Sequence, residues 1–260
     1  MKKIPTIATV AKMLAGSLLL SLPLATQADE NIEEVLVSAS LLPIAATRSA
    51  NAITVIDSEQ LKNRAANSVS DLLRDIPGLA VSRSGVQGSQ TQIRVRGAEA
   101  NHLLVLIDGV EANDPSQGDE LNWGTLTTSD IERVEVIRGP QSAMRGSDAM
   151  AGVVNIITRS AEQPLSGKVF AETGSFSTNK LGLSVGHKAE KYDVSLGVTE
   201  LESAGDNIIL NTGTNDNDGY QNTSINFKAG VDASDELRLT LSLSQSDGFS
   251  EYDDEYAAKI

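Results

Sequence analysis

Apolar and small polar side chains alternate along the chain from Lys168 to about Ser246. A period of two residues is that of a β-strand, because successive side chains point to opposite faces of a sheet. In the clearest run, from Leu237 to Leu243, every second residue is leucine and the residues between are Arg, Thr and Ser. The pattern predicts about five strands that each have one apolar face. The positions predicted on that face include Leu181, Leu183, Val194, Leu196, Leu239 and Leu241.

The connections between these strands alternate in length. A long polar connection, about residues 202–220, joins the third predicted strand to the fourth, and a new polar stretch begins at Ser246. The turns near residues 189–190 and 233–234 are short. Long loops at one end and short turns at the other are typical of a transmembrane β-barrel. Half of a soluble β-sandwich is the alternative, since its strands also alternate.

Residues 51–160 have a mixed pattern that predicts a small α+β domain. A helix is expected to begin at Ser58, which could serve as its N-cap, and a second helix to run from Ser68 to Ile76 and to end at Pro77. The dipeptide Asp108-Gly109 after an apolar run is a hairpin signal. Short strands are predicted at residues 53–57, 79–82, 92–96, 102–107, 133–138 and 153–158.

The N-terminus has the three parts of a secretory signal peptide, expected to span residues 1–28. Lys2 and Lys3 precede an apolar run that ends near Leu24, and small residues follow. An uncleaved anchor is the alternative, but Lys12 interrupts the run, which is also short for a membrane span. Residues 29–50 combine acids with a short β-prone run, and this composition predicts a mobile segment.

Charge and composition exclude some classes of function. The formal net charge is −14, and removal of residues 1–28 would take away three lysines and no acid, which leaves −17. Nucleic-acid recognition needs a basic surface, so nucleic acid is not an expected partner. The chain has no cysteine, which excludes disulfides and thiolate metal sites.

Two stretches carry a resemblance to a known family. They are QIRVRGAEANHLLVLIDGVEANDP, residues 92–115, and IERVEVIRGPQSAMRGSDAMAGVVNIIT, residues 131–158. They resemble the plug domain of TonB-dependent outer-membrane receptors, which import scarce nutrients into Gram-negative bacteria. The resemblance implies an α+β plug domain at residues 51–160, followed at 161–260 by the first antiparallel strands of a transmembrane β-barrel that is incomplete. It also implies residence in the outer membrane, contact with its lipid, and transport without catalysis.

The run EEVLVSAS, residues 33–40, resembles the TonB box of this family. An extended apolar segment can add to the exposed sheet edge of a partner through main-chain hydrogen bonds. The implied partner is TonB, with the inner-membrane complex that energises it. The residues expected in the box are Glu33, Glu34, Val35, Leu36, Val37, Ser38 and Ala39.

Polar loops are expected at the plug apex, where a ligand would arrive, and they supply candidate contacts at Gln87, Gln90, Asn113 and Trp123. The segments NTGTNDNDGY and SDGFSEYDDEY resemble extracellular loops of the vitamin B12 receptors of the family, in which aspartates bind calcium. That resemblance implies a substrate contact at Tyr252 and Ca²⁺ ligands at Asp206, Asp216, Asp218 and Asp253. Clustered carboxylates suit Ca²⁺, which prefers oxygen ligands.

The resemblance to vitamin B12 receptors implies transport of cobalamin, and three alternatives to this function stay open. The first is a ferric-siderophore receptor, and the second is a soluble periplasmic binding module. The third is a serine hydrolase, because residues 182–186 match the G-x-S-x-G nucleophile motif. That motif needs a strand-to-helix turn, whereas Ser184 falls inside an alternating strand.

Three plug arginines, Arg94, Arg96 and Arg138, are expected to form ion pairs that dock the plug in its barrel.

Overall fold

The computed structural model describes residues 36–37, 44–45, 52–207 and 217–251 of the 260-residue chain. These residues belong to one compact unit, Val35–Ile260. The predicted signal peptide lies outside the described residues. No helix in the described ranges is long and apolar enough to cross a membrane.

Residues 52–158 form an N-terminal domain built on a five-stranded sheet. Its strands, in spatial order, are β3 (Ala52–Ile56), β8 (Ile131–Arg138), β9 (Gly152–Thr158), β6 (Leu103–Ile107) and β7 (Val110–Glu111). β6 and β9 pair in parallel, and the other neighbours are antiparallel. The central strands are rich in Val, Ile and Leu, and they contribute to one hydrophobic cluster on each face of the sheet. Such nearly continuous apolar runs are typical of strands that are buried on both faces.

The helices of this domain are short. They are α2 (Ser58–Arg64), α3 (Val69–Arg74), α4 (Ser142–Arg145) and the 3₁₀ turns η2 (Ala100–His102), η3 (Pro115–Gln117) and η4 (Trp123–Thr125). The prediction that Ser58 caps the first helix is wrong, because the Asp57 carboxylate accepts the Gln60 N–H at 2.8 Å. Ser68 caps α3 and accepts the N–H of Asp71 at 3.3 Å. A cap oxygen of this kind satisfies one of the free N–H groups at the start of a helix.

Two small strand pairs complete the N-terminal part. β4 (Leu79–Arg83) and β5 (Thr91–Val95) form an antiparallel pair whose connecting segment carries Gln87 and Gln90. The two-residue strands β1 (Leu36–Val37) and β2 (Ile44–Ala45) pair with each other.

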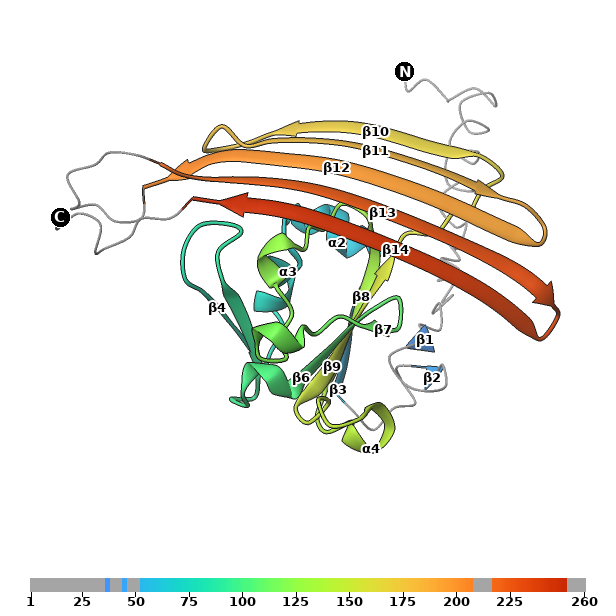
Figure 1. Ribbon diagram of the computed structural model, residues 1–260, viewed down its shortest axis with the longest axis horizontal. Coiled ribbons are helices and arrows are strands. Elements are labelled where there is room, and N and C mark those ends of the chain that lie inside the picture. Colours follow the sequence, from blue (N-terminus) through green and yellow to red (C-terminus); the bar gives the residue numbers. More distant parts are fainter. Residues whose placement is uncertain (1–35, 38–43, 46–51, 208–216, 252–260) are drawn as a thin grey trace, which may run out of the picture. The chain divides into compact units, whose positions relative to one another are not determined.

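The second layer is a C-terminal sheet of five antiparallel strands, as the alternating pattern predicted (Figure 1). The strands follow sequence order: β10 (Ser166–Thr173), β11 (Asn179–Lys188), β12 (Tyr192–Asp206), β13 (Asp218–Ser234) and β14 (Leu237–Ser250). Residues that are directly opposite in the ladder share a face. The row Val185, Leu196, Phe227 and Leu243 is one such set.

The outer face of the C-terminal sheet is apolar and exposed, and the inner face contacts the N-terminal domain. Five of the six positions predicted on the apolar face, Leu181, Leu183, Leu196, Leu239 and Leu241, are between 39% and 59% exposed, and Val194 is half-buried. The inner positions between them are mostly small or polar. The predicted faces are therefore confirmed, whereas contact with lipid stays a prediction.

The ends of the strands differ from the prediction. The long connection was expected at about residues 202–220, but the ladder continues to Ser203 and Tyr220 and, after a bulge, to Asp206 and Asp218. β14 likewise continues past Ser246 to Ser250. Polar side chains replace apolar ones in these end segments, so the hydrophobic alternation stops before the backbone pairing does.

Candidate functional site

The turn between β6 and β7 places a carboxylate against the C-terminal sheet. Asp108 and Gly109 both have positive φ, 51° and 82°. This combination matches a tight two-residue hairpin turn, which the Asp-Gly dipeptide favours, and the hairpin prediction is confirmed. The turn projects the Asp108 side chain out of the domain, and only 5% of that side chain is exposed.

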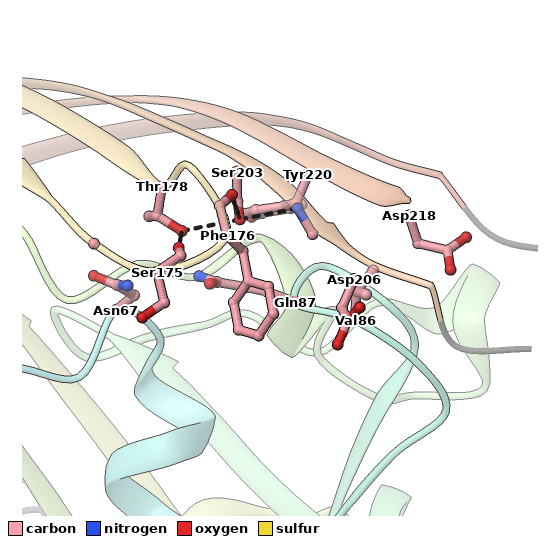
Figure 2. Close-up of a pocket in the computed structure, with 12 residues that line it drawn as sticks. Asn67, Val86, Gln87, Ser175, Phe176, Thr178, Ser203, Asp206, Asp218 and Tyr220 are labelled. Atoms are coloured by element: carbon pink, nitrogen blue, oxygen red, sulfur yellow. Dashed lines mark hydrogen bonds between the residues drawn. The ribbon is translucent and has the colours of Figure 1, made fainter. Parts of the chain in front are cut away.

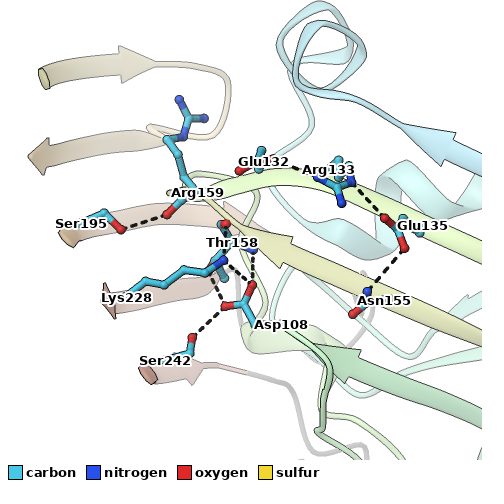
Figure 3. A network of polar contacts seen from close by, with 10 residues as sticks. All are labelled: Asp108, Glu132, Arg133, Glu135, Asn155, Thr158, Arg159, Ser195, Lys228 and Ser242. Carbon is cyan, nitrogen blue, oxygen red and sulfur yellow. Dashed lines mark hydrogen bonds and ion pairs between the residues drawn. The ribbon is translucent and has the colours of Figure 1, made fainter. Parts of the chain in front are cut away.

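Four side-chain or main-chain donors surround this carboxylate (Figure 3). One oxygen accepts the Thr158 N–H at 3.0 Å and the Lys228 ammonium at 2.8 Å. The other accepts the hydroxyls of Thr158 at 2.5 Å and Ser242 at 2.7 Å. Lys228 and Ser242 belong to neighbouring strands of the C-terminal sheet, whereas Thr158 ends β9. A buried carboxylate with an ion pair and this many donors is stabilised in its charged form.

Two carboxyl groups at this interface have shifted pKa values. Burial alone would raise the pKa of Asp108, but the hydrogen bonds from Lys228, Thr158 and Ser242 outweigh it, and the pKa is below its ordinary range. Burial raises the pKa of Asp130 to about 6, and the Arg159 guanidinium only partly opposes that rise. Asp130 packs so closely against β12 that a Cβ atom at Gly197 would lie 2.6 Å from its carboxyl carbon. A larger residue at position 197 would therefore displace the Asp130 carboxyl.

Further hydrogen bonds join the N-terminal domain to the inner face of the C-terminal sheet. The hydroxyl of Tyr220 donates to the carbonyl of Gly124 at 2.9 Å. The carbonyl of Thr125 accepts from the Asn222 amide at 3.2 Å and from the Ser246 hydroxyl at 2.9 Å. These contacts extend from the Asp108 turn toward the ends of the strands, so the sheet holds the domain at several points.

Two of the three arginines expected to dock the domain in the sheet, Arg94 and Arg138, bond within the N-terminal domain instead. Arg94 donates to the Gln92 side chain at 2.7 Å. Arg138 donates to the carbonyls of Ala52 and Pro77 and to the Thr54 hydroxyl. Among the described residues no ion pair joins Arg94, Arg96 or Arg138 to the C-terminal sheet, and the ion pair that does cross is Lys228 with Asp108. The expected docking role of these arginines is therefore wrong for this sheet.

A separate polar network stabilises the interior of the domain (Figure 3). The fully buried Glu135 carboxylate accepts from the Arg133 guanidinium at 2.9 Å and from the Asn155 amide at 3.4 Å. Arg133 also contacts Glu132 at 3.0 Å. A buried charge needs such partners to offset its loss of hydration.

A cavity of about 400 Å³ lies at the long-loop end of the strands, between the segment that follows β4 and the strands β12 and β13 (Figure 2). Its lining includes Gln87, Phe176, Asp206, Asp218 and Tyr220. Figure 2 shows the Phe176 ring in the cavity beside Gln87. Phe176 and Ser177 have positive φ, 56° and 52°, which is uncommon for residues other than glycine.

The turn that carries Phe176 is held in this conformation by hydrogen bonds. The Gly174 N–H donates to the Thr178 carbonyl at 2.8 Å, and the Ala204 N–H of β12 donates to the Phe176 carbonyl at 2.9 Å. The hydroxyls of Thr178 and Ser203 are 2.9 Å apart. The cavity is thus lined by a fixed turn with one aromatic ring and by two carboxylates.

The structure brings together three of the predicted site residues. Gln87, Asp206 and Asp218 line the same cavity, and Asp206 and Asp218 are partners in the β12–β13 ladder. In the described residues no group of three or more histidines and acids is close enough to hold a metal ion. Asp216, Asp253 and Tyr252 lie outside the described residues, so the calcium site stays a prediction.

The other three expected ligand contacts lie elsewhere. Gln90 lines a neighbouring cavity of about 410 Å³ with Gln117 and Glu120. Asn113 bonds the Val105 N–H at 2.8 Å and the carbonyls of Leu103 and Asp119. Trp123 is 3% exposed and packs in the hydrophobic core. Asn113 and Trp123 stabilise the N-terminal domain, which argues against their expected roles as ligand contacts.

Two sequence motifs have clear positions. Of the expected TonB box only Leu36 and Val37 are described, and their backbones pair with Ala45 and Ile44. Ser184, the centre of the G-x-S-x-G match, lies in the middle of β11 and not at a strand-to-helix turn. The hydrolase alternative therefore lacks the geometry that its motif requires.

The interface residues Asp108 and Lys228 were not among the expected site residues. A signal for Lys228 is present in the sequence, because it is a lone cation at an inner position between Asn226 and Gly230. Such a residue needs a partner when the face is covered.

An α+β domain that is hydrogen-bonded to the polar inner face of an antiparallel sheet with an apolar outer face has the arrangement of a plug against part of a barrel wall; the described strands form an open sheet of five. Comparisons with known proteins identify the family. The TonB-dependent receptor plug domain matches residues 45–153. The vitamin B12 transporter BtuB of Photobacterium profundum is 34% identical over 79% of this chain and 34% of its own length. BtuB of Vibrio vulnificus is 32% identical over 77% of this chain and 33% of its own.

A solved structure supports the same assignment. The siderophore receptor PirA from Acinetobacter baumannii is 26% identical and has a TM-score of 0.63 over 77% of this chain and 32% of its own. The chain belongs to the family of TonB-dependent receptors, its N-terminal domain is a plug domain, and its relatives are transporters and receptors, not enzymes. It spans about a third of the length of the curated relatives it matches.

Proposed function

We propose that the chain forms the plug and the first wall strands of an outer-membrane transporter for cobalamin. The observation that carries this proposal is the opposite character of the two faces of the C-terminal sheet. The outer face is a continuous exposed apolar surface, and the inner face holds the plug through the buried pair of Lys228 with Asp108. An outer-membrane strand needs one face for lipid and one for the interior.

The choice of cobalamin rests on the curated relatives, which are vitamin B12 transporters. A ferric siderophore is the second candidate, because the similar solved structure is a siderophore receptor. Equilibrium binding of radiolabelled cyanocobalamin and of a ferric siderophore, measured on outer membranes that contain the protein, separates the two. Saturable binding of cyanocobalamin supports the proposal, and saturable binding of only the siderophore replaces it with the second candidate.

The TonB box proposal predicts that Leu36→Pro abolishes energised uptake. Proline removes a main-chain donor and fixes φ, so the segment can no longer pair along its length with a partner strand. The measurement is uptake of the bound ligand in cells with and without TonB, together with binding at the cell surface, which is expected to be unchanged.

The matched control is Ala45→Pro. It interrupts the same β1–β2 pairing seen here, since Leu36 pairs with Ala45, but it leaves the box intact. Uptake that survives Leu36→Pro would contradict the proposal, and so would an equal loss in both variants.

A further part of the proposal is that Asp206, Asp216, Asp218 and Asp253 bind Ca²⁺ and order the loops around the ligand. Its support is that Asp206 and Asp218 pair across the ladder and line one cavity with Gln87. Calcium needs six to eight oxygen ligands at roughly 2.3–2.6 Å, so the loss of two carboxylates is expected to abolish binding. Loops that are already ordered lower the entropic cost of binding a ligand.

The expected result is that a chelator weakens cyanocobalamin binding by wild type, and that Asp216→Asn with Asp218→Asn shows the weak affinity with or without calcium. Asp235→Asn with Glu236→Gln is the matched control, because it removes two exposed acids from the short turn between β13 and β14. Wild-type affinity that is the same with calcium and with chelator would exclude the calcium-linked mechanism.

A further inference from the structure

A basic cavity lies between the N-terminal domain and the first two strands of the C-terminal sheet. It has a volume of about 310 Å³ and is separate from the cavity with Asp206 and Asp218. Four cationic side chains line it, against the single acid Glu172. The cations are Lys62, Arg159, Lys168 and Lys180. This excess of positive charge occurs in a chain whose net charge is −14.

Lys180 is the central residue of the basic cavity. Its side chain is 7% exposed, and its ammonium lies 4.0 Å from the nearest acid, Glu172, whose side chain is 60% exposed. Among the described residues no acceptor receives a hydrogen bond from this ammonium. An ammonium that is removed from water without an acceptor is costly, and structures normally provide a partner for it. The geometry therefore favours an additional acceptor in the cavity.

The wall next to Lys180 positions a second cation. The ring of Phe170 lies over Gly182, where a Cβ atom would displace the ring. The ammonium of Lys168 is 4.8 Å from the centre of this ring, and that of Lys180 is 5.8 Å away. Aromatic rings attract cations at such distances, so Phe170 interacts with both ammonium groups.

Two more donors come from Ser129 of the N-terminal domain and from Arg159, which directly follows β9. The Ser129 hydroxyl oxygen is buried and has no hydrogen-bond partner in the described part of the chain. The Arg159 guanidinium donates to the carbonyl of Ile131 at 3.5 Å, and its charge also acts on the Asp130 carboxyl. Figure 3 shows this guanidinium extending away from the Asp108 network. Ser129 and Arg159 both line the basic cavity.

We propose that the basic cavity binds a phosphate group, either as inorganic phosphate or as a small phosphomonoester, between the plug and the barrel wall. The group has several acceptor oxygens, which can serve the Lys180 ammonium, the Arg159 guanidinium and the Ser129 hydroxyl together. Charge-assisted hydrogen bonds of this kind are stronger than neutral ones. The volume of the basic cavity, about 310 Å³, is at the lower end of the range for sites that bind small ligands.

The test is calorimetric titration of the full chain in detergent at low salt with inorganic phosphate and, in a second arm, with glycerol 3-phosphate. Wild type is expected to bind at one site. Lys180→Met is expected to weaken binding about tenfold or more, because it removes a charged donor and keeps the length of the side chain. The matched control is Lys188→Met, which removes an exposed lysine of the same strand and is expected to bind as wild type.

A second variant, Ser129→Ala, separates lost binding from lost folding, because it removes one hydroxyl from the plug side and leaves the sheet intact. It is expected to weaken binding severalfold while its far-UV circular dichroism is unchanged. Tighter binding of glycerol 3-phosphate than of phosphate would identify an ester as the ligand, and the reverse order would identify the free anion. The proposal is overturned if wild type binds neither compound, or if Lys180→Met and Ser129→Ala both bind as wild type does.

Discussion

Replacing Lys228 by methionine is expected to destabilise the docked plug by about 3–5 kcal/mol, because it leaves the Asp108 carboxylate buried without its cation. The value is expected at the lower end of that range, since the hydroxyls of Thr158 and Ser242 still donate to the carboxylate. The measurement is the denaturant midpoint of the full chain in detergent, followed by the rate at which a protease cleaves the N-terminal domain.

Two further variants test the cause of this effect. Lys188→Met removes an exposed lysine of the same sheet and is expected to change the midpoint little. The double variant Lys228→Met with Asp108→Asn is expected to be more stable than Lys228→Met alone, because the amide has no charge to bury. If Lys228→Met has the same midpoint as the control, the pair does not hold the plug.

The second large effect is expected for Leu241→Arg on the outer face of β14. A cation near the middle of the bilayer costs roughly 2–4 kcal/mol on the lipid face of a barrel strand, whereas the inner face tolerates it. Leu241 is 53% exposed on that face. The variant is expected to reduce the amount of protein that is assembled in the outer membrane, measured by heat-modifiable migration on gels.

The matched control is Thr240→Arg, which places the same side chain on the inner face one residue earlier. Ser242 is a poorer control, although it also faces inward, because its hydroxyl donates to Asp108 at 2.7 Å. Equal assembly of Leu241→Arg and Thr240→Arg would favour a soluble sheet over a membrane wall.

The faces of the C-terminal sheet could be predicted because a period of two is set by backbone geometry alone. The ends of the strands in this sheet could not be predicted from the same pattern. Beyond Leu201 the side chains of β12 are mostly polar, while the backbone still pairs with β13 as far as Asp206. The N-cap of α2 was predicted one residue too late. Asp57 and Ser58 are adjacent and both are good N-caps, so the sequence alone does not separate them.

The candidate site was predicted in part. Gln87, Asp206 and Asp218 were expected from a polar loop and clustered acids, and they line one cavity. Trp123 was expected to contact a ligand because it ends the polar stretch at residues 111–123, but its side chain packs in the core. Asp108 and Lys228 are 120 positions apart in the sequence. The local pattern around each residue does not indicate that the other is its partner.

β13 is longer than a strand needs to be to cross the apolar band of a barrel. The strand has 17 residues, which at about 3.4 Å each is roughly 58 Å of chain. Tilted by about 45°, it rises roughly 40 Å, whereas the apolar band of a barrel is about 25 Å tall. On β12 the outward residues change from Val198 to Glu200 and Glu202 toward the Asp206 end. In the proposed outer-membrane transporter the excess length stands in water beyond the hydrocarbon, so the cavity at that end meets ligands that never enter the lipid.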